Sequence, residues 1–354
     1  MRTPAKGGSE PESADRAVAS GVSPEPDAPE RDFESTLRPR KLEEFVGQAR
    51  VLSNLRVAIG AARSRGEALE HVLLSGPPGL GKTSLSRILA QEMSSRLFGT
   101  SGPALERPRD LVGILTQLEK GDVLFVDEVH RVPANVEEYL YGAMEDFKVD
   151  FTLDQGPHAR VLPLTLARFT LVGATTREGL LSAPFRARFG IAERLEYYPR
   201  ADLEAIVARS AGILGVAIDA EARALIASRA RGTPRIANRF LRRARDLAQV
   251  EGKAGIDAAL AADTLARIGV DENGLEELDR RILAVLARGT REPLGLKTIA
   301  AAVGEAEDTI EEVFEPHLLR EGFLEKTSRG RRITAAGCRA IGVDPRPARD
   351  GTLF

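Results

Sequence analysis

The chain has 354 residues, of which 43% are hydrophobic, and its 50 basic residues are balanced by 52 acidic ones. This length predicts two or three domains, and the near-zero net charge gives no global sign of nucleic-acid binding. No apolar run approaches the roughly 18 residues that cross a membrane, and the N-terminus lacks the apolar core of a secretory signal, so we expect a cytoplasmic protein. The single cysteine, Cys338, excludes an internal disulfide and a thiolate zinc site.

The two ends of the chain differ in composition from the rest. Residues 1–31 carry five prolines, many small and acidic residues and no aromatic side chain. Such a segment cannot bury enough apolar surface to offset the entropy of ordering it. We therefore expect a disordered tail over residues 1–31, and a short C-terminal tail over 345–354.

The first domain is predicted from short apolar runs at 72–74, 123–126 and 169–172, which alternate with helix-length amphipathic segments. Buried strands separated by helices are typical of a parallel sheet wound with helices. We predict an α/β domain of this kind over residues 32–198.

Helical periodicity replaces the strand pattern after residue 198. Over residues 199–272 the apolar positions repeat at helical spacing, which predicts a small all-helical domain. Three helices and two short extended pieces follow in residues 273–344, an order that describes a winged-helix module. The third of these helices is predicted from an apolar face of Ile310, Val313, Phe314 and Leu318.

A glycine-rich loop follows the first apolar strand. Residues 76–83 read Gly-Pro-Pro-Gly-Leu-Gly-Lys-Thr. Between a strand and a helix, such glycines let backbone N–H groups converge on phosphate oxygens, at the positive end of the helix dipole. Lys82 is then placed to reach the β- and γ-phosphates, and Thr83 to bind Mg²⁺ through its hydroxyl. The loop predicts binding of a nucleoside triphosphate, and an ordinary Gly/Pro turn is the alternative.

Polar side chains end the next two apolar strands, at the edge where open parallel sheets bind ligands. Asp127 suits the carboxylate that holds Mg²⁺ in P-loop ATPases, and Glu128 is placed to polarise the attacking water. The strand after it ends in Thr175 and Thr176, whose hydroxyls could orient that water. The alternatives are an acidic cap and hydroxyls that only terminate a strand.

Arginines occur at two further points. Arg186 and Arg188 lie two positions apart in an apolar helical segment, so they face different ways and should have different roles. One of them could cross a subunit boundary as an arginine finger, or both could be solvated surface charges. Arg235 follows a Gly-Thr-Pro turn in the first turn of a helix and could reach back toward the γ-phosphate.

Taken in order, these motifs resemble those of the AAA+ ATPases, and within them the RuvB family of bacterial Holliday-junction branch-migration motors. The resemblance extends from about residue 37 to residue 342. It departs from the family pattern at 290–295, which read Thr-Arg-Glu-Pro-Leu-Gly where a Gly-Gly-Pro-Val-Gly type of turn is usual. The stretches that go beyond general AAA+ motifs are 37–48, 100–104, 127–131, 143–147 and 173–177.

The resemblance implies roles for individual residues. Thr176 would be the sensor-1 residue and Arg235 the sensor-2 residue. Arg188 would be the finger that acts on a neighbouring subunit, with Arg186 as the alternative. The nucleotide-binding set that it implies is Leu37 and Arg38 beside the adenine, Gly79, Gly81, Lys82, Thr83 and Ser84 in the P-loop, then Glu145, Asp146, Phe147, Arg188 and Arg235, and Tyr198 at the lid junction.

A hairpin is expected in the first domain. Residues 150–164, with a Gly-Pro turn at 156–157, resemble the family's protruding β-hairpin, which docks on the partner RuvA. Leu162 and Leu164 alternate on one face of it, and exposed apolar side chains on a hairpin indicate a covering partner. The alternative is that these leucines pack on their own domain.

Positive charges gather in the predicted wing of the winged-helix module. Such charges around a glycine suit phosphate contacts that are independent of base sequence and sensitive to salt. A solvated charged loop is the alternative. The four wing cations are Lys326, Arg329, Arg331 and Arg332.

The favoured function is an ATP-hydrolysing ring motor that translocates duplex DNA and drives branch migration of four-way junctions in recombination and repair. The resemblance implies a homo-hexamer that uses Mg²⁺, works with RuvA and joins the RuvC resolvase in a larger complex. The main alternative is a clamp-loader-type ATPase, although such subunits end in a helical collar and not in a module with a basic hairpin. Two less favoured functions are a protein unfoldase with a pore loop at 97–99 and a nucleotide-binding scaffold without turnover.

Overall fold

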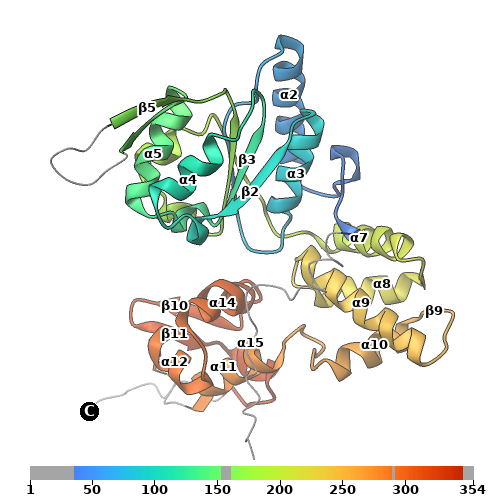
Figure 1. Cartoon of the computed structure of the whole chain (residues 1–354). Coiled ribbons are helices and arrows are strands. Elements are labelled where there is room, and N and C mark those ends of the chain that lie inside the picture. The colour runs from blue at the N-terminus through green and yellow to red at the C-terminus, as the bar shows by residue number, and fades with distance from the viewer. Residues whose placement is uncertain (1–35, 153–160, 289–291, 346–354) are drawn as a thin grey trace, which may run out of the picture.

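The computed structural model describes residues 36–152, 161–288 and 292–345. Figure 1 shows an α/β domain, a helical domain beside its lower edge and a third domain below it. The tail predicted at 1–31, and the C-terminal one apart from residue 345, lie outside the described residues.

The α/β domain is built on a parallel sheet, as the sequence predicts. Its strand order is β2-β3-β6-β1-β7, and every neighbouring pair is parallel. The three strands predicted from apolar runs form the centre, and the less buried β2 and β7 form the edges. The strands are β1 (Val72–Ser75), β2 (Leu97–Ser101), β3 (Val123–Asp127), β6 (Thr170–Thr175) and β7 (Ile191–Arg194).

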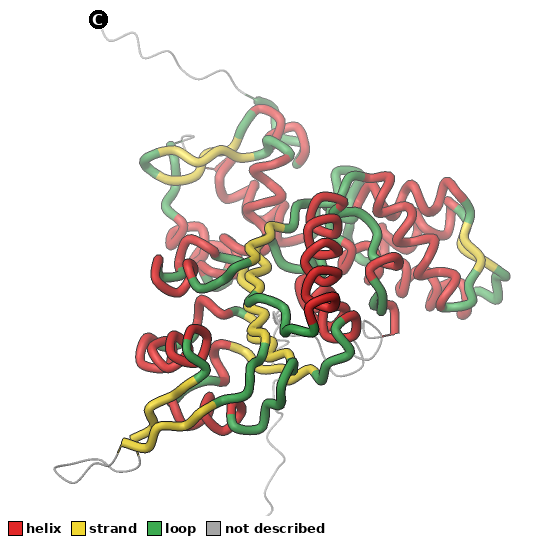
Figure 2. Tube along the Cα trace, turned by 90° about the horizontal axis from the view of Figure 1, so that it is seen from above, coloured by secondary structure: helices red, strands yellow, loops and turns green. Residues whose placement is uncertain are grey.

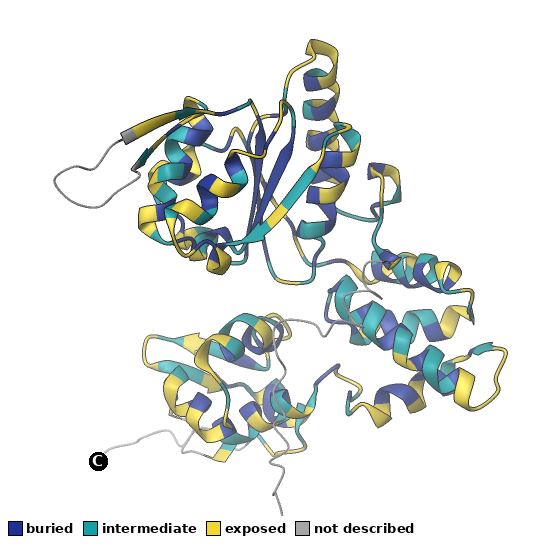
Figure 3. Ribbon diagram, viewed as in Figure 1, coloured by how far each residue is buried: buried dark blue, intermediate teal, exposed yellow. Residues whose placement is uncertain are grey.

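Helices cover both faces of this sheet, because alternate strand residues point to opposite sides. Val72 and Leu74 pack in one apolar cluster with α2 and α3, and Leu73 packs in another with α4 and α5. Figure 3 shows the central strands buried between helices whose outer faces are exposed. The covering elements are α2 (Ala49–Arg65), α3 (Lys82–Glu92), α4 (Pro108–Leu115), α5 (Ala134–Glu145) and α6 (Ala183–Ala187), with the short turns η1 (Leu42–Glu44), η2 (Gly102–Ala104), η3 (Val129–Arg131) and η4 (Glu178–Leu180).

A separate hairpin leaves the body of the α/β domain, as Figure 2 shows. Its strands, β4 (Lys148–Thr152) and β5 (Val161–Thr165), pair antiparallel, with Phe151 opposite Leu162 and Val149 opposite Leu164. The Gly-Pro turn predicted between them lies outside the described residues.

The second domain consists mainly of helices that share an apolar core with the first. One cluster of buried side chains runs from α2 and α3 through Tyr198 and Leu203 to Val270. The expectation of an all-helical domain is wrong in one detail, because β8 (Ala217–Ile218) and β9 (Gly255–Ile256) form a two-residue parallel ladder. The helices are α7 (Arg200–Ile213), α8 (Ala220–Arg229), α9 (Pro234–Val250) and α10 (Ala258–Arg267).

The third domain has the predicted helices and β-hairpin around a core of its own. No residue of the other two domains belongs to that core, so its described attachments to them are mainly polar. Its elements are α11 (Glu277–Arg288), α12 (Leu296–Val303), α13 (Glu307–Thr309), η5 (Ile310–Phe314), α14 (Glu315–Arg320), β10 (Leu324–Thr327), β11 (Gly330–Ile333) and α15 (Ala335–Ala340).

One helix of this domain deviates from the predicted pattern. The segment η5 is a π-helical turn that ends at Phe314, two residues before Pro316 of α14. Proline lacks an N–H and clashes with the preceding turn, so a local widening of the helix accommodates it. The extra residue rotates Val313 away from the predicted apolar face, and Val313 is 41% exposed while Ile310 and Phe314 are buried.

Candidate nucleotide site and its connections to the DNA-binding wing

The P-loop lies between β1 and α3 and needs its glycines. Gly76, Gly79 and Gly81 have φ angles of 130°, 77° and 107°, which only glycine adopts readily. A Cβ on Gly76 would come within 2.4 Å of the Leu195 carbonyl oxygen. The loop therefore brings backbone N–H groups to the N-terminus of α3, where an anion is favoured.

Lys82 is the buried cation of this loop. Its Nζ donates hydrogen bonds to the carbonyl oxygens of Gly76 and Pro77, at 2.7 and 2.9 Å. Burial lowers the pKa of Lys82, and the carboxylates of Glu128 and Asp127 oppose that shift. The ammonium therefore lies in the field of both acidic residues that the sequence assigns to the site.

Glu128 is held at the end of β3 in an unusual backbone conformation. Its φ of 47° is left-handed, and strained backbone of this kind clusters at functional sites. The hydroxyl of Thr176 donates to Glu128 Oε2 at 3.2 Å, so the structure brings together the predicted water-activating residue and the predicted sensor. Burial, followed by the Asp127 carboxylate, raises the pKa of Glu128, while Lys82 opposes this.

His130 lies beside Glu128 and Thr175, and the sequence did not predict a role for it. Its Nδ1 lies 3.3 Å from Glu128 Oε2 and 2.9 Å from the hydroxyl of Thr175. Burial lowers the pKa of His130, and so does the nearby Arg177. A neutral imidazole at this position orients Glu128 without adding a positive charge beside Lys82.

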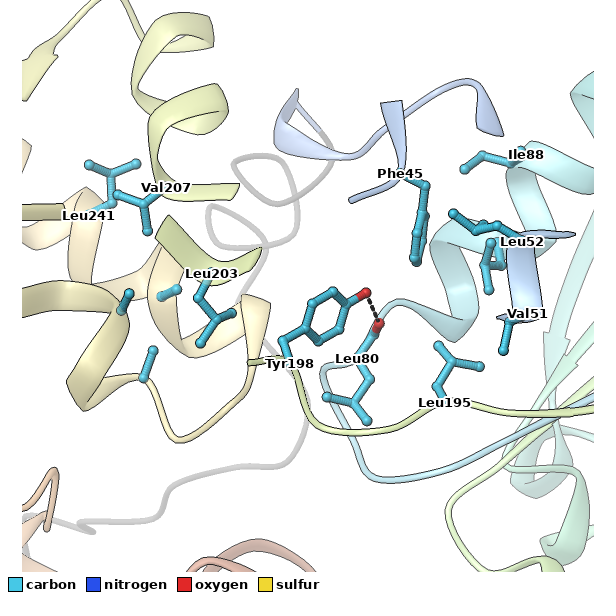
Figure 4. Close-up of a cluster of buried hydrophobic side chains, with 14 of the residues drawn as sticks. Phe45, Val51, Leu52, Leu80, Ile88, Leu195, Tyr198, Leu203, Val207 and Leu241 are labelled. Carbon is cyan, nitrogen blue, oxygen red and sulfur yellow. Dashed lines mark hydrogen bonds between the residues drawn. The ribbon is translucent and has the colours of Figure 1, made fainter. Parts of the chain in front are cut away.

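The helical domain contacts the P-loop directly. A Cβ on Gly79 would meet Thr233 at 2.7 Å and Arg235 at 3.1 Å, so the predicted sensor-2 residue lies against the loop. Tyr198 donates from its hydroxyl to the carbonyl oxygen of Leu80 at 3.1 Å, as Figure 4 shows. Tyr198 therefore lies between the two domains, and the nucleotide contact that the resemblance implies for it stays a prediction.

The N-terminal segment lies at the same junction. Leu37 is buried, and its carbonyl oxygen accepts a hydrogen bond from Arg209 of α7 at 2.8 Å. Phe45 lies over the P-loop, because a Cβ on Gly81 would come within 2.9 Å of its ring. Arg38 follows Leu37 and is partly exposed.

The two candidate finger arginines differ in their surroundings. Arg186 is exposed, whereas the side chain of Arg188 is 18% exposed and contacts α5. There the Nη2 atom of Arg188 lies 3.1 Å from Glu145, and its guanidinium lies 4.1 Å from the ring centre of Tyr141. Arg188 and Glu145 therefore share one surface of the domain, and Arg188 must exchange partners to act elsewhere.

The neighbours of Glu145 in the predicted nucleotide-binding set have different environments. Asp146 is exposed at the end of α5. Phe147 has a left-handed φ of 53°, and its ring packs edge-on against Phe169 at 5.9 Å. Phe147 therefore contributes to the core at the base of the hairpin.

The two hairpin leucines are not equally exposed. Leu162 is 44% exposed, whereas Leu164 is partly buried against the apolar cluster of its own domain. A covering partner would therefore reach Leu162 first.

The four wing cations also divide into two groups. Arg329 is exposed at the tip of the β10–β11 hairpin, and Arg332 pairs with Glu325 on the neighbouring strand at 2.5 Å. Lys326 and Arg331 face the other way and pair with Glu315, at 2.5 and 2.9 Å.

The comparisons with known proteins agree with this organisation. Three family models match: the Holliday junction DNA helicase RuvB P-loop domain over residues 37–195, the RuvB AAA lid domain over 198–271 and the RuvB C-terminal winged helix domain over 272–342. The Holliday junction branch migration complex subunit RuvB of Chlorobium luteolum is 55% identical, over 93% of this chain and 95% of that protein. The chain belongs to the RuvB family.

Other relatives extend this result. The subunit of the same name from Myxococcus xanthus is 55% identical over 91% of this chain and 94% of that protein. The solved Thermotoga maritima RuvB Holliday junction branch migration motor matches with a TM-score of 0.81 and 44% identity, over 88% of this chain and 100% of that one.

Membership in the RuvB family decides the class of activity. The protein is an AAA+ ATP hydrolase of the branch-migration class, and the clamp-loader alternative is not favoured. The segment 97–99, considered as a pore loop, lies in the edge strand β2. Within the residues that the structure describes, every helix is too short or too polar to cross a membrane.

The sequence did not predict two polar contacts that join the winged-helix domain to the rest of this RuvB-family chain. Arg177, the residue after Thr176, lies 2.8 Å from Glu312. Arg231, just before the Gly-Thr-Pro turn, pairs with Asp279 at 2.5 Å. Arg177 belongs to a stretch diagnostic of the family, but only the fold reveals its partners.

Proposed function

We propose that this protein is an ATP-driven motor that moves duplex DNA and so drives branch migration of four-way junctions. The observation that carries the proposal is the joining of Lys82, Glu128 and Thr176 at one sheet edge, in a chain that ends in a winged-helix domain. An ATPase site fused to a DNA-binding module suits a motor better than a switch that acts on a protein partner.

The residues of the site divide the chemistry among them. Lys82 and the backbone of the P-loop bind the β- and γ-phosphates of ATP, and Glu128 orients and polarises the attacking water. The Thr176 hydroxyl fixes one oxygen of Glu128, which leaves the other for water. The oxygens of Thr83 and Asp127 suit Mg²⁺, a hard cation that is usually held by few protein ligands together with substrate phosphates. When bound, Mg²⁺ neutralises charge on those phosphates.

Hydrolysis is proposed to require assembly into a homo-hexamer. Arg188 of one subunit would complete the site of its neighbour, where it would stabilise charge in the transition state. The surface that Arg188 shares with Glu145 supports this arrangement, because both would then lie at the same subunit boundary. Exposed Arg186 is the second candidate on that surface.

The remaining elements suggest the partners. The projecting hairpin with exposed Leu162 is proposed as the surface for RuvA, and the wing, with Arg329 at its tip, as a contact for DNA phosphates. RuvC would join through a larger complex. We place the motor in the cytoplasm, where bacterial chromosomal DNA is found.

A synthetic four-way junction tests the proposal. With RuvA and ATP, the wild-type chain should separate the junction into duplexes, and Lys82→Ala should not, because the cation for the phosphates is lost. Lys253→Ala, which removes a lysine paired with Glu251 in the lid, is the matched control and should act as the wild type does. Equal junction separation by Lys82→Ala would refute the assignment.

Mixed subunits test the role of Arg188. Arg188→Ala and Glu128→Gln should each be inactive, and mixtures should recover part of the hydrolysis because some boundaries then combine an intact finger with an intact base. Absence of recovery at every mixing ratio would contradict a finger that acts between subunits. The same experiment with Arg186→Ala distinguishes the two candidates.

A further inference from the structure

An acidic segment of the winged-helix domain lies between the ATPase site and the wing. It comprises Asp308, Glu311, Glu312 and Glu315, which follow one another at spacings of three, one and three residues through α13, η5 and α14. Such spacings place side chains on one side of a helix. The π-helical turn before Pro316 lies in the middle of this segment, and turns of this kind occur frequently at functional sites.

On one side, the acidic segment holds Arg177. The Nη2 atom of Arg177 lies 3.3 Å from Asp308, 3.3 Å from Glu311 and 2.8 Å from Glu312. The side chains of Arg177 and Glu312 are 29% and 31% exposed, so the contact is only partly shielded from water. One cation therefore faces three carboxylates across the boundary between the two domains.

Arg177 is connected in turn to the predicted catalytic carboxylate. Its backbone N–H donates to the Thr175 hydroxyl at 3.0 Å, and that hydroxyl contacts His130 at 2.9 Å. His130 lies 3.3 Å from Glu128. A displacement of Arg177 therefore acts on the groups that orient Glu128. It also acts on Thr176, which immediately precedes Arg177 in the chain and donates a hydrogen bond to Glu128.

On the other side, the acidic segment holds two of the wing cations. Glu315 pairs with Lys326 at 2.5 Å and with Arg331 at 2.9 Å. The Oε1 atom of Glu311 lies 3.7 Å from Lys326 and 3.6 Å from Arg331, while its Oε2 atom faces Arg177. Glu311 is thus the member of the segment that contacts both the ATPase domain and the wing.

We propose that Arg177 is a positioning residue through which the winged-helix domain reports DNA binding to the ATPase site, with Glu311 as the shared partner. The inference rests on the proposed function, because it takes DNA as the ligand of the wing. Phosphates of DNA compete with Glu311, whose side chain is 39% exposed, for Lys326 and Arg331, while the buried Glu315 keeps its pairs with them. When the wing cations turn from Glu311 to DNA, Glu311 loses two cationic neighbours and keeps Arg177, so the geometry at Arg177 changes.

The electrostatics of the site agree with this connection. Burial lowers the pKa of Lys82 and raises the pKa of Glu128, and the Glu312 carboxylate adds a smaller effect that favours the protonated form of both groups. A change in the charge around Arg177 therefore reaches them without a large movement of the backbone.

The experiment compares ATP hydrolysis with and without a saturating linear DNA duplex, using the full chain. For each variant, kcat and KM for ATP are measured. The readout is the kcat measured with DNA divided by the kcat measured without DNA. Arg177→Gln and Glu311→Gln should bring that ratio closer to one by at least about two-fold. Arg177→Lys, which keeps the charge, should recover part of the effect of DNA.

A matched control separates this role from a general effect of charge. Glu325→Gln removes the carboxylate that pairs with Arg332 on the same hairpin, whereas the carboxylates that hold Arg177 are those of the acidic segment. Glu325→Gln should bind DNA more tightly, since it frees Arg332, but only Glu311→Gln, which removes the carboxylate shared by Arg177 and the wing, should reduce the ratio. Thermal unfolding of each variant checks that the fold is retained.

The outcomes distinguish the inference from the proposed function. A ratio that is unchanged in Arg177→Gln and Glu311→Gln, or reduced equally in Glu325→Gln, overturns the inference. A wild-type chain that hydrolyses ATP at the same rate with and without DNA also overturns it but leaves the ATPase assignment intact. A wild-type chain without any ATP hydrolysis removes the proposed function, and the inference with it.

Discussion

The winged-helix domain is attached to the other two domains by contacts of opposite character. Arg231 and Asp279, which join it to the lid, have side chains that are 5% and 0% exposed. Asp308 and Glu312, which join it to the ATPase domain through Arg177, are 81% and 31% exposed. One attachment is buried in the protein and the other is open to water.

The buried attachment is also linked to the hinge and to the P-loop. Arg231 donates from Nε to the carbonyl oxygen of Gly274 at 2.9 Å, and its own carbonyl oxygen accepts from Arg320 at 3.1 Å. The Arg320 guanidinium lies 4.2 Å from the ring centre of Tyr197, in the hinge between the first two domains. Two residues after Arg231, Thr233 touches the P-loop glycine Gly79.

Burial determines which of the two attachments can open and close. A buried ion pair is strongly destabilised when one partner is removed, so it does not open easily. Exposed carboxylates exchange partners with little loss of free energy. We therefore expect the winged-helix domain to move together with the lid, while its contact with the ATPase domain forms and breaks during the cycle.

Loss of the buried attachment should strongly destabilise the fold. Asp279→Ala should reduce the free energy of unfolding by about 3–5 kcal/mol, because it leaves the Arg231 guanidinium buried without its partner. Urea denaturation measures this loss. Asp308→Ala is the control at the exposed attachment and should cost less than about 1 kcal/mol. Equal losses in the two variants would show that burial does not distinguish the attachments.

The stability contributed by the buried attachment should depend on pH through Asp279. Burial raises the pKa of Asp279 to about 6, against the opposing effect of Arg231. Because the folded chain then binds this proton more strongly than the unfolded chain, Asp279 favours folding below its ordinary pKa near 4, and that contribution is lost as pH rises through 6. Relative to Asp279→Asn, the stability of the wild type should fall by up to about 3 kcal/mol between pH 4 and pH 6. A flat difference across this range would contradict the shift.

The effect of salt on stability should be small, but it should differ clearly between the exposed attachment and the buried one. Arg177→Gln should cost at most about 1 kcal/mol of stability at low salt. At about 1 M salt, where the Debye length is about 3 Å, this cost should disappear, whereas the loss in Asp279→Ala should persist. Urea titrations at two salt concentrations measure both. A salt-independent loss in Arg177→Gln would mean that its contact is not an exposed ion pair.

The features that the sequence predicts well are those encoded locally. The P-loop glycines and the apolar strands 72–74, 123–126 and 169–172 each determine their own conformation, and the structure confirms the parallel sheet. The edge strand β7 was not predicted, because it lacks the continuous apolar run of the central strands. The exposure of Val313 depends on the π-helical turn before Pro316, which helical periodicity does not anticipate.

The contacts between domains could not be predicted from spacing. Arg177 and Glu312 are separated by more than a hundred positions, and either could have been a solvated surface charge. Sequence reasoning assigned Arg331 to phosphate contact, and the structure adds that Glu315 holds this side chain. The predicted roles of Arg188, Arg235 and the wing cations remain predictions that the variants above address.

Energy transfer between labelled domains shows whether the winged-helix domain moves with the lid. Val57 in α2, Val250 in the lid and Val343 in the winged-helix domain are 71%, 85% and 40% exposed, and the native Cys338 is buried, so cysteine pairs at these positions can carry fluorescent labels. On addition of ATP and duplex DNA, energy transfer between Val57→Cys and Val343→Cys should change, while transfer between Val250→Cys and Val343→Cys should stay constant. A change in the second pair with a constant first pair would show that the winged-helix domain moves with the ATPase domain and not with the lid.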